Sequence, residues 1–214
     1  SEVIDGYMRF KRGQMNMILG GDNVGKSYWF QWYALALSTH HNIKWTLWMG
    51  EDEVGETMIN LVQMLSGKNF FHLQPHEIKK HFIRVENWFT FVDPSNVYTP
   101  DELLTLFKES NSDAFLIDPY TGLKRGYGHT DNYDFLNTVR EFCNTAKKTV
   151  YISLHPSSES QRVSGQWGKG HSLEGYQKPP KKADAEGGQP FANRADDFLI
   201  IHRYAQHELF SEIT

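Results

Sequence analysis

An eight-residue segment near the start of the chain constrains the fold more than any other feature of the sequence. This segment matches the Walker A pattern G-x-x-x-x-G-K-[ST] at every fixed position. The apolar run 15–19 before it predicts a buried strand, and residues 26–38 after it predict a helix. A strand, a glycine-rich turn and a helix in this order predict a phosphate-binding loop. Its residues are Gly20, Gly21, Asp22, Asn23, Val24, Gly25, Lys26 and Ser27.

The residue types of this loop suit the binding of a nucleoside triphosphate. Glycines let successive backbone N–H groups turn toward the phosphates, and the helix that begins near Lys26 directs its positive dipole end at the same anion. We expect the Lys26 ammonium to reach the β- and γ-phosphates and the Ser27 hydroxyl to coordinate Mg²⁺. The loop alone does not name a reaction, because kinases, GTPases and ATPase motors share it.

Apolar strand-like runs alternate with helical patterns along the rest of the chain. Further strands are predicted at 44–49, 89–92, 114–117, 149–154 and 198–201, and further helices at 53–66, 99–108 and 135–146. This alternation predicts one α/β domain over 1–214, with a mostly parallel sheet and helices on both faces. Residues 157–188 are the exception, because they lack apolar periodicity and are rich in Gly, Ser, Lys and Pro. They predict a long, basic and mobile loop.

Polar side chains follow three of the predicted strands directly. Asp118 ends the apolar run 114–117, where ligands bind at the edge of an open parallel sheet, and it is a candidate Mg²⁺ ligand. Glu51 follows another strand and can orient or deprotonate an attacking water, although the sequence does not separate it from Asp52 and Glu53. His155 follows a third strand, where it can contact a γ-phosphate.

Composition excludes several classes of protein. A hydrophobic content of 39% over 214 residues is enough for a core and excludes wholesale disorder. No run approaches the ~18 apolar residues of a membrane span, and the first residues have no secretory signal. The single cysteine, Cys143, excludes an internal disulfide framework and fits a reducing compartment. It lies on an apolar helix face, so we expect it in the core.

Charge limits how this chain can bind nucleic acid. The formal net charge is −4, so binding would need a local basic patch. Residues 162–182 hold five basic residues and one acidic, a local net charge of +4. The candidate nucleic-acid-binding residues are Lys124, Arg125, Arg162, Lys169, Lys178, Lys181 and Lys182. Trp167 and Tyr176 are candidate platforms for stacked bases.

Taken together, these motifs resemble the RecA-like motor domain of ring-forming replicative helicases, a group that includes DnaB-like helicases, phage primase–helicases and mitochondrial Twinkle. The resemblance covers about residues 12–203. It rests on the segments 12–20, 49–51, 117–120, 153–156 and 187–203. It implies a RecA-like P-loop NTPase fold that uses ATP and Mg²⁺. It also implies Glu51 and Lys26 as catalytic residues, Asp118 on the Mg²⁺-binding strand, and His155 as the γ-phosphate sensor.

The resemblance further implies partners, and the sequence departs from the family in two places. The implied partners are single-stranded DNA, copies of the same chain in a hexameric ring, and other replication proteins. The family supplies an arginine finger to the neighbouring subunit from beyond its last strand, yet no Arg or Lys follows Arg203 here. No segment corresponds to the family's primase or accessory domain. Primase activity is therefore not carried over to this chain. Because the sequence starts with Ser and stops inside the apolar-alternating stretch 209–214, we interpret it as a piece of a longer protein.

The leading interpretation is an ATP-dependent DNA helicase motor from the cytoplasm of a bacterial or phage-infected cell. The nearest alternative is a RepA-like or RecA-like DNA-binding ATPase without unwinding activity. A P-loop kinase is a weaker alternative, because kinases place an Arg-rich lid over the phosphates and residues 157–188 contain only Arg162. A non-catalytic nucleotide-binding module is the third, and the combination of Lys26, Ser27, Asp118 and Glu51 argues against it.

Overall fold

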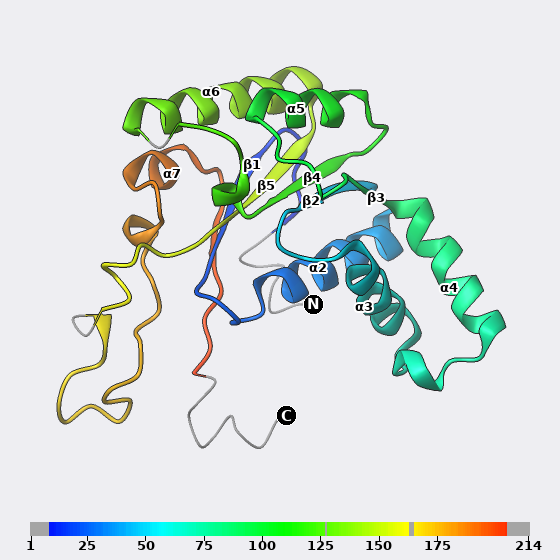
Figure 1. Cartoon of the computed structure of the whole chain (residues 1–214), viewed down its shortest axis with the longest axis horizontal. Helices are drawn as coiled ribbons and strands as arrows, with labels where there is room; N and C mark the ends of the chain where they lie inside the picture. The colour runs from blue at the N-terminus through cyan, green and yellow to red at the C-terminus, as the bar shows by residue number, and fades with distance from the viewer. Residues whose placement is uncertain (1–8, 127, 163–164, 205–214) are drawn as a thin grey trace.

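A parallel sheet forms the centre of the computed structural model, which describes residues 9–126, 128–162 and 165–204 (Figure 1). Its six strands are β1 (Met15–Leu19), β2 (Trp45–Met49), β3 (Phe89–Phe91), β4 (Ala114–Asp118), β5 (Thr149–Leu154) and β6 (Phe198–Ile200). They lie in the order β3-β2-β4-β5-β1-β6, and each neighbouring pair is parallel. Every residue of β1, β2, β4 and β5 is buried, which explains their continuous apolar sequences. The predicted parallel sheet is confirmed.

Helices cover both faces of this sheet, as the alternating pattern predicted (Figure 1). The helices are α2 (Lys26–His41), α3 (Val54–Ser66), α4 (Pro75–Trp88), α5 (Pro100–Glu109), α6 (His129–Ala146) and α7 (Gln189–Arg194). One core cluster joins the sheet to α5, α6 and α7 through residues such as Phe107, Leu136 and Phe191. The other joins it to α2, α3 and α4 through residues such as Phe30 and Leu61. None of the described helices is long and apolar enough to cross a membrane.

Two helix starts show how local sequence sets the element boundaries. At α5, the Thr99 side chain accepts a hydrogen bond from the Glu102 backbone N–H, and Glu102 accepts one from the Thr99 N–H at 2.8 Å. At α4, Glu77 accepts from the Gln74 N–H at 2.9 Å in the same way. The sequence analysis did not predict α4. Val85 is its one buried residue, yet Ile78, Phe82 and Trp88 pack on the core with it at helical spacing, so the pattern was present in the sequence and was overlooked.

Cys143 lies in the core cluster that joins the sheet to α5, α6 and α7, as predicted. Its side chain is fully buried, and its thiol donates to the Gln14 carbonyl oxygen at 3.4 Å. Burial raises the pKa of the Cys143 thiol to about 12. The neutral thiol therefore acts as a small apolar core residue.

Residues 157–188 form a long excursion beyond β5, drawn in yellow and orange in Figure 1. Its base is closed by a bridge between Pro156 and Ala185, and the Ser157 N–H donates to the Asp184 oxygen at 2.6 Å. Farther out, the Trp167 N–H donates to the Tyr176 oxygen at 2.9 Å. The described part of this loop is held by turns, isolated β-bridges and the single turn η4 (Lys182–Asp184) rather than by paired strands.

Candidate nucleotide site

The predicted site residues follow the carboxyl ends of four neighbouring strands, β2, β4, β5 and β1. The strand register aligns these ends, since Met49 pairs with Asp118 and Leu19 pairs with Leu154. Backbone hydrogen bonds continue one residue beyond the strands. The Gly50 N–H donates to the Asp118 oxygen at 2.7 Å, and the Gly20 N–H donates to the Leu154 oxygen at 3.3 Å. The sheet therefore fixes where each site residue leaves its strand.

The phosphate-binding loop turns sharply between β1 and α2. Gly25, the residue before α2, has φ 91°, a left-handed conformation that favours glycine. Gly20 has no room for a side chain, because a Cβ atom there would lie 2.6 Å from the Ile201 carbonyl oxygen. These two glycines bring the loop back over the end of β1, and α2 begins at Lys26. Its N-terminus then faces the loop, as an anion site requires.

The Lys26 ammonium is held inside the loop. Its Nζ donates to the Gly20 oxygen at 2.7 Å and to the Gly21 oxygen at 3.0 Å, and the residue is 8% exposed. Burial lowers the pKa of Lys26, while the carboxylates of Asp118, Asp22 and Glu51 act against this by favouring the charged form. The cation thus lies in a partly dehydrated setting, where its interaction with a phosphate is stronger than in bulk water.

Ser27 and Asp118 meet directly. The Ser27 hydroxyl donates to Asp118 Oδ2 at 2.8 Å, and Asp118 is 7% exposed. Hydroxyl and carboxylate oxygens are the ligands that Mg²⁺ prefers, together with phosphate oxygens and water. The pair therefore fits a nucleotide-bound Mg²⁺. Among the described residues, no group of three or more His, Cys, Asp or Glu side chains is arranged as a metal site.

The structure separates the three neighbouring acids that the sequence left together. The half-buried Asp52 has its pKa raised, first by burial and then by the nearby Asp118 carboxylate, while a hydrogen bond with Ser27 opposes the shift. Glu51 is more open, with 67% of its side chain exposed, and its Oε2 lies 4.0 Å from His155 Nε2. Glu53 is exposed at the N-cap of α3. Asp52 therefore lies beside the Ser27–Asp118 pair, and Glu51 lies beside His155.

His155 lies between two carboxylates. Its Nδ1 is 3.0 Å from Asp22 Oδ1 in the phosphate-binding loop, and its Nε2 faces Glu51. Its backbone oxygen accepts a hydrogen bond from the Glu186 N–H at 2.8 Å, at the far end of the long loop. Sequence reasoning assigned Asp22 to the loop through the motif alone and did not pair it with His155. No local pattern signals such a contact.

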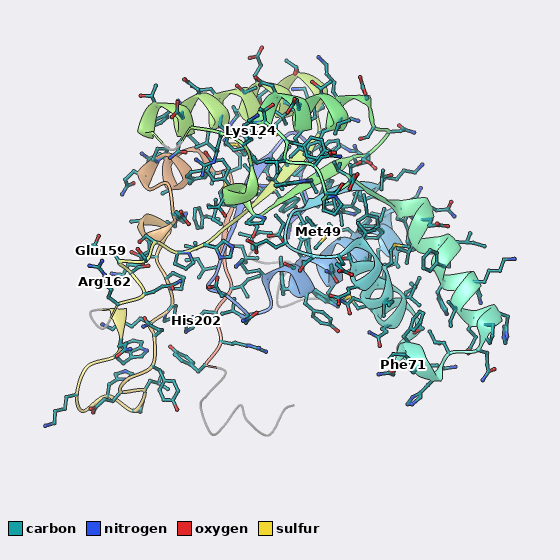
Figure 2. All side chains as sticks on the ribbon, in the orientation of Figure 1. Met49, Phe71, Lys124, Glu159, Arg162 and His202 are labelled. Carbon is teal, nitrogen blue, oxygen red and sulfur yellow. The ribbon has the colours of Figure 1, made fainter. Side chains whose placement is uncertain are left out.

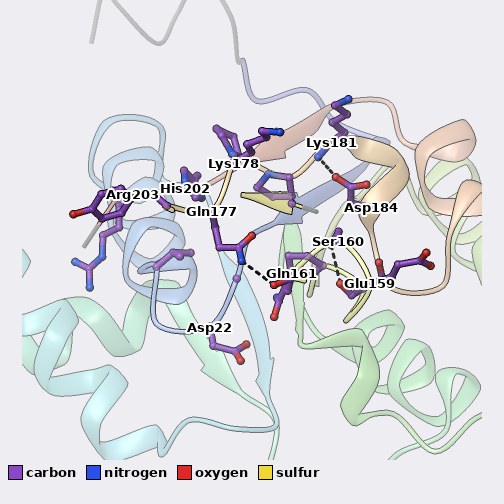
Figure 3. A pocket seen from close by; sticks show the side chains of 18 of the residues that line it. Asp22, Glu159, Ser160, Gln161, Gln177, Lys178, Lys181, Asp184, His202 and Arg203 are labelled. Atoms are coloured by element: carbon purple, nitrogen blue, oxygen red, sulfur yellow. Dashed lines mark hydrogen bonds between the residues drawn. The ribbon is translucent and has the colours of Figure 1, made fainter. Parts of the chain in front are cut away.

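A second contact that sequence reasoning missed joins the end of the sheet to the phosphate-binding loop. The Arg203 guanidinium donates to the Asn23 oxygen at 3.0 Å. A cavity of about 930 Å³ lies between the phosphate-binding loop, the long loop and residues 202–204. Figure 3 shows Asp22, Lys178 and Arg203 around this cavity. The cavity extends the site from the phosphate-binding loop toward the long loop.

The predicted nucleic-acid-binding residues fall into two groups. Arg162, Lys169, Lys178, Lys181 and Lys182 are all exposed on the long loop. Arg125 is elsewhere and half-buried, with its guanidinium 3.6 Å from the centre of the Tyr120 ring and Nη1 3.3 Å from Asn132 Oδ1. Figure 2 shows Lys124 beside α5 and α6, away from Arg162 on the long loop. Lys178 and Lys181 line the cavity beside the phosphate-binding loop, whereas Lys124 and Arg125 do not belong to the long loop.

The two aromatic residues of the long loop contact other protein groups. The Trp167 ring stacks on His171 with centroids 4.0 Å apart, and its Nε1 donates to the Tyr204 hydroxyl at 3.2 Å. The Tyr176 ring makes an edge contact with Tyr204 at 6.1 Å. Both rings thus join the loop to the segment that follows β6. A base that stacks on either of them would meet a ring already in contact with its neighbours.

Comparison with known proteins identifies the fold. No protein-family model and no curated protein sequence matches the chain. Among solved structures, one described as an ATPase domain superposes with a TM-score of 0.70 and 14% identity over 95% of this chain and 74% of that chain. A DnaB-like replicative helicase, whose structure was described with its interactions with primase, gives 0.71 and 13% over 94% of this chain. The chain spans 49% of that helicase. It therefore has the α/β fold of RecA-like helicase ATPase domains.

Proposed function

We propose that this chain is the ATP-hydrolysing motor domain of a DnaB-like replicative helicase, folded as one domain. The observation that carries the proposal is the 2.8 Å hydrogen bond between Ser27 of the phosphate-binding loop and Asp118 at the end of β4. Two residues 91 positions apart in the chain are in contact, and their oxygens are of the kind that a Mg²⁺–nucleotide complex needs, which supports the proposal. Lys26 lies in the same loop, and Glu51 follows the neighbouring strand β2.

The binding roles follow from the geometry. The backbone N–H groups of 20–27 and the N-terminus of α2 would surround the β- and γ-phosphates, with the Lys26 ammonium placed to neutralise them. Ser27 and Asp118 would hold Mg²⁺, which when bound supplies positive charge to the phosphate oxygens. Asp52 stands next to that pair and can accept hydrogen bonds from water around the ion.

The hydrolytic roles belong to Glu51 and His155. Glu51 is the candidate base, because its exposed carboxylate can accept a proton from a water that approaches the phosphates from the open side of the site. The His155 Nε2 faces the same region and can contact the γ-phosphate. The His155 backbone oxygen also accepts a hydrogen bond from the Glu186 N–H of the long loop, so the state of the nucleotide can be transmitted to that loop.

The proposed partner is single-stranded DNA, bound in a ring of copies of this chain. The exposed cations of the long loop, Arg162, Lys169, Lys178, Lys181 and Lys182, would contact the phosphate backbone, and Lys124 and Arg125 would act from the loop after β4. A local charge of +4 is modest, so a hexamer that repeats it would bind far better than one copy. The ring would also supply the arginine finger and a surface for other replication proteins.

The test measures Mg²⁺-dependent ATP binding and ATP turnover, with and without single-stranded DNA. We expect Mg²⁺-dependent binding that Asp118→Asn and Ser27→Ala weaken, and turnover that DNA stimulates. Asp134→Asn, an exposed change on α6, is the matched control and should behave like the unchanged protein. Absence of Mg²⁺-dependent nucleotide binding would refute the proposal. Phosphate transfer to a small acceptor would indicate a kinase, and stimulation without strand separation would indicate a RecA-like ATPase.

A further inference from the structure

The residue at position 22 is unexpected for a phosphate-binding loop. The motif leaves this position free, so the phosphate site does not require an aspartate there. A carboxylate near bound phosphates repels them, which makes Asp22 unfavourable for nucleotide binding by itself. Its Oδ1 lies 3.0 Å from His155 Nδ1, and the two side chains are 78% and 20% exposed. The motif does not account for this contact with His155.

The Asp22 carboxylate favours a proton on the imidazole nitrogen that faces it. An ionised carboxylate has only acceptor atoms, so its charge favours a proton on His155 Nδ1, which lies 3.0 Å from Asp22 Oδ1. The other nitrogen, Nε2, then points toward Glu51, with 4.0 Å between Nε2 and Oε2. In sites where a histidine acts through one nitrogen, the partner of the other nitrogen sets its tautomer and orientation.

We propose that Asp22 is a positioning residue that fixes the tautomer and orientation of His155, so that Nε2 is presented to Glu51 and to the γ-phosphate. The inference rests on the proposed function and adds to it a residue-level control of the same site. The His155 backbone is already held by the bond from the Glu186 N–H. The ring can still rotate about its side-chain bonds, and the electrostatic contact with the Asp22 carboxylate restricts that rotation.

The first experiment reads the tautomer directly by ¹⁵N NMR of the imidazole nitrogens, in nucleotide-free protein above the ordinary titration range of histidine. The chain has 10 histidines, so His155→Ala assigns the signal. We expect a protonated Nδ1 in the unchanged protein and a shift of the proton toward Nε2 in Asp22→Ala. An unprotonated Nδ1 in the unchanged protein, or the same signal in Asp22→Ala, would overturn the proposal. Neither result depends on ATP turnover.

The second experiment is a double-mutant cycle on DNA-stimulated turnover. Asp22→Ala should lower kcat by about 10–100-fold, the range that loss of a histidine's orienting partner costs in metal sites, with KM for ATP little changed. In a His155→Ala background, the same change should cost nothing further, because Asp22 acts through His155. An equal loss in both backgrounds would refute this. Asp134→Asn is again the control. Failure of the proposed function itself would instead appear as absence of ATP turnover in the unchanged protein.

Discussion

The phosphate-binding edge of the sheet and the loop of residues 157–188 lie side by side, yet they are held by different means. At the edge, buried strands pair in register: Asp118 ends β4, and Glu51 and His155 follow β2 and β5 within two positions. In the loop, isolated bridges, turns and ring contacts hold the chain. The first arrangement draws on the whole hydrophobic core, and the second on a few local contacts.

This difference indicates which region holds its side chains in fixed positions. Catalytic groups must stay within fractions of an ångström, which rigid strand ends provide better than loops. A segment that grips a flexible polymer benefits from adjustable contacts, and low local stability is typical of such segments. We therefore expect single changes at the edge to have large and chemically specific effects, and changes in the loop to have smaller, additive ones.

The largest effect should come from Lys26→Ala. The buried ammonium is the fixed cation of the site, so its loss should reduce ATP hydrolysis to background and weaken nucleotide binding. Steady-state turnover and equilibrium binding of a fluorescent ATP analogue measure the two effects. Lys80→Ala on the exposed face of α4 is the control. Unchanged turnover in Lys26→Ala would remove the ATPase proposal.

Glu51→Gln should come next. The amide keeps the shape of the side chain and loses its basicity, so nucleotide binding should survive while turnover falls about 10²–10⁴-fold. Asp52→Asn is the informative comparison, because Asp52 lies beside Ser27 and its pKa is raised by burial. If Asp52→Asn produces the large loss and Glu51→Gln does not, Asp52 is the base. Glu53→Gln, at the exposed N-cap of α3, should have little effect.

The same contrast explains what the sequence predicts well. The strands and the phosphate-binding loop follow from local patterns, because a buried parallel strand is a continuous apolar run and the loop has a fixed spacing of Gly and Lys. The ends of such strands meet at one edge, so the sequence alone predicts that Asp118 and Glu51 lie near Ser27. Helix α4 was predictable in the same way, because Ile78, Phe82 and Val85 have helical spacing, but the sequence analysis overlooked it.

Contacts between distant residues have no local pattern. Arg203 and Asn23 are separated by 180 positions, and the hydrogen bond between them depends on the neighbouring strands β1 and β6. The pairing of Asp22 with His155 likewise depends on the adjacency of β1 and β5. The hydrogen bond from Trp167 Nε1 to the Tyr204 hydroxyl is another contact between distant residues that no local pattern predicts. The mobility of the long loop stays a prediction.

A smaller effect is expected when Lys178, Lys181 and Lys182 are changed together to alanine. Each phosphate contact to a single strand contributes about 0.7 to the slope of log affinity against log salt concentration, so three contacts should lower that slope by about 2. The loss should be the same for all DNA sequences, since phosphate contacts carry no base information. Fluorescence anisotropy with labelled single strands at several salt concentrations measures both.

The matched control for this triple change replaces three exposed lysines on the helical layers, Lys79, Lys80 and Lys108. The two triple variants alter the net charge equally, so a general electrostatic effect would appear in both. An equal salt slope in the two variants would leave the loop as a solvated insertion and place the DNA contacts elsewhere.

The smallest effect is expected from Trp167→Phe. Phenylalanine can still stack on His171, but it removes the hydrogen bond from Trp167 Nε1 to the Tyr204 hydroxyl. Such a bond contributes about 0.5–1.5 kcal/mol, which corresponds to about 2–10-fold faster opening of the segment that it holds. Hydrogen exchange should therefore accelerate at the Trp167 and Lys178 amides, whose N–H groups donate to Tyr176 and Gly165.

The amides of β5 should not change, because the paired strands do not depend on this contact. Trp32→Phe on α2 is the control. Equal acceleration in β5 and the loop would show that the two regions open together, which would contradict the difference in stability on which the comparison depends.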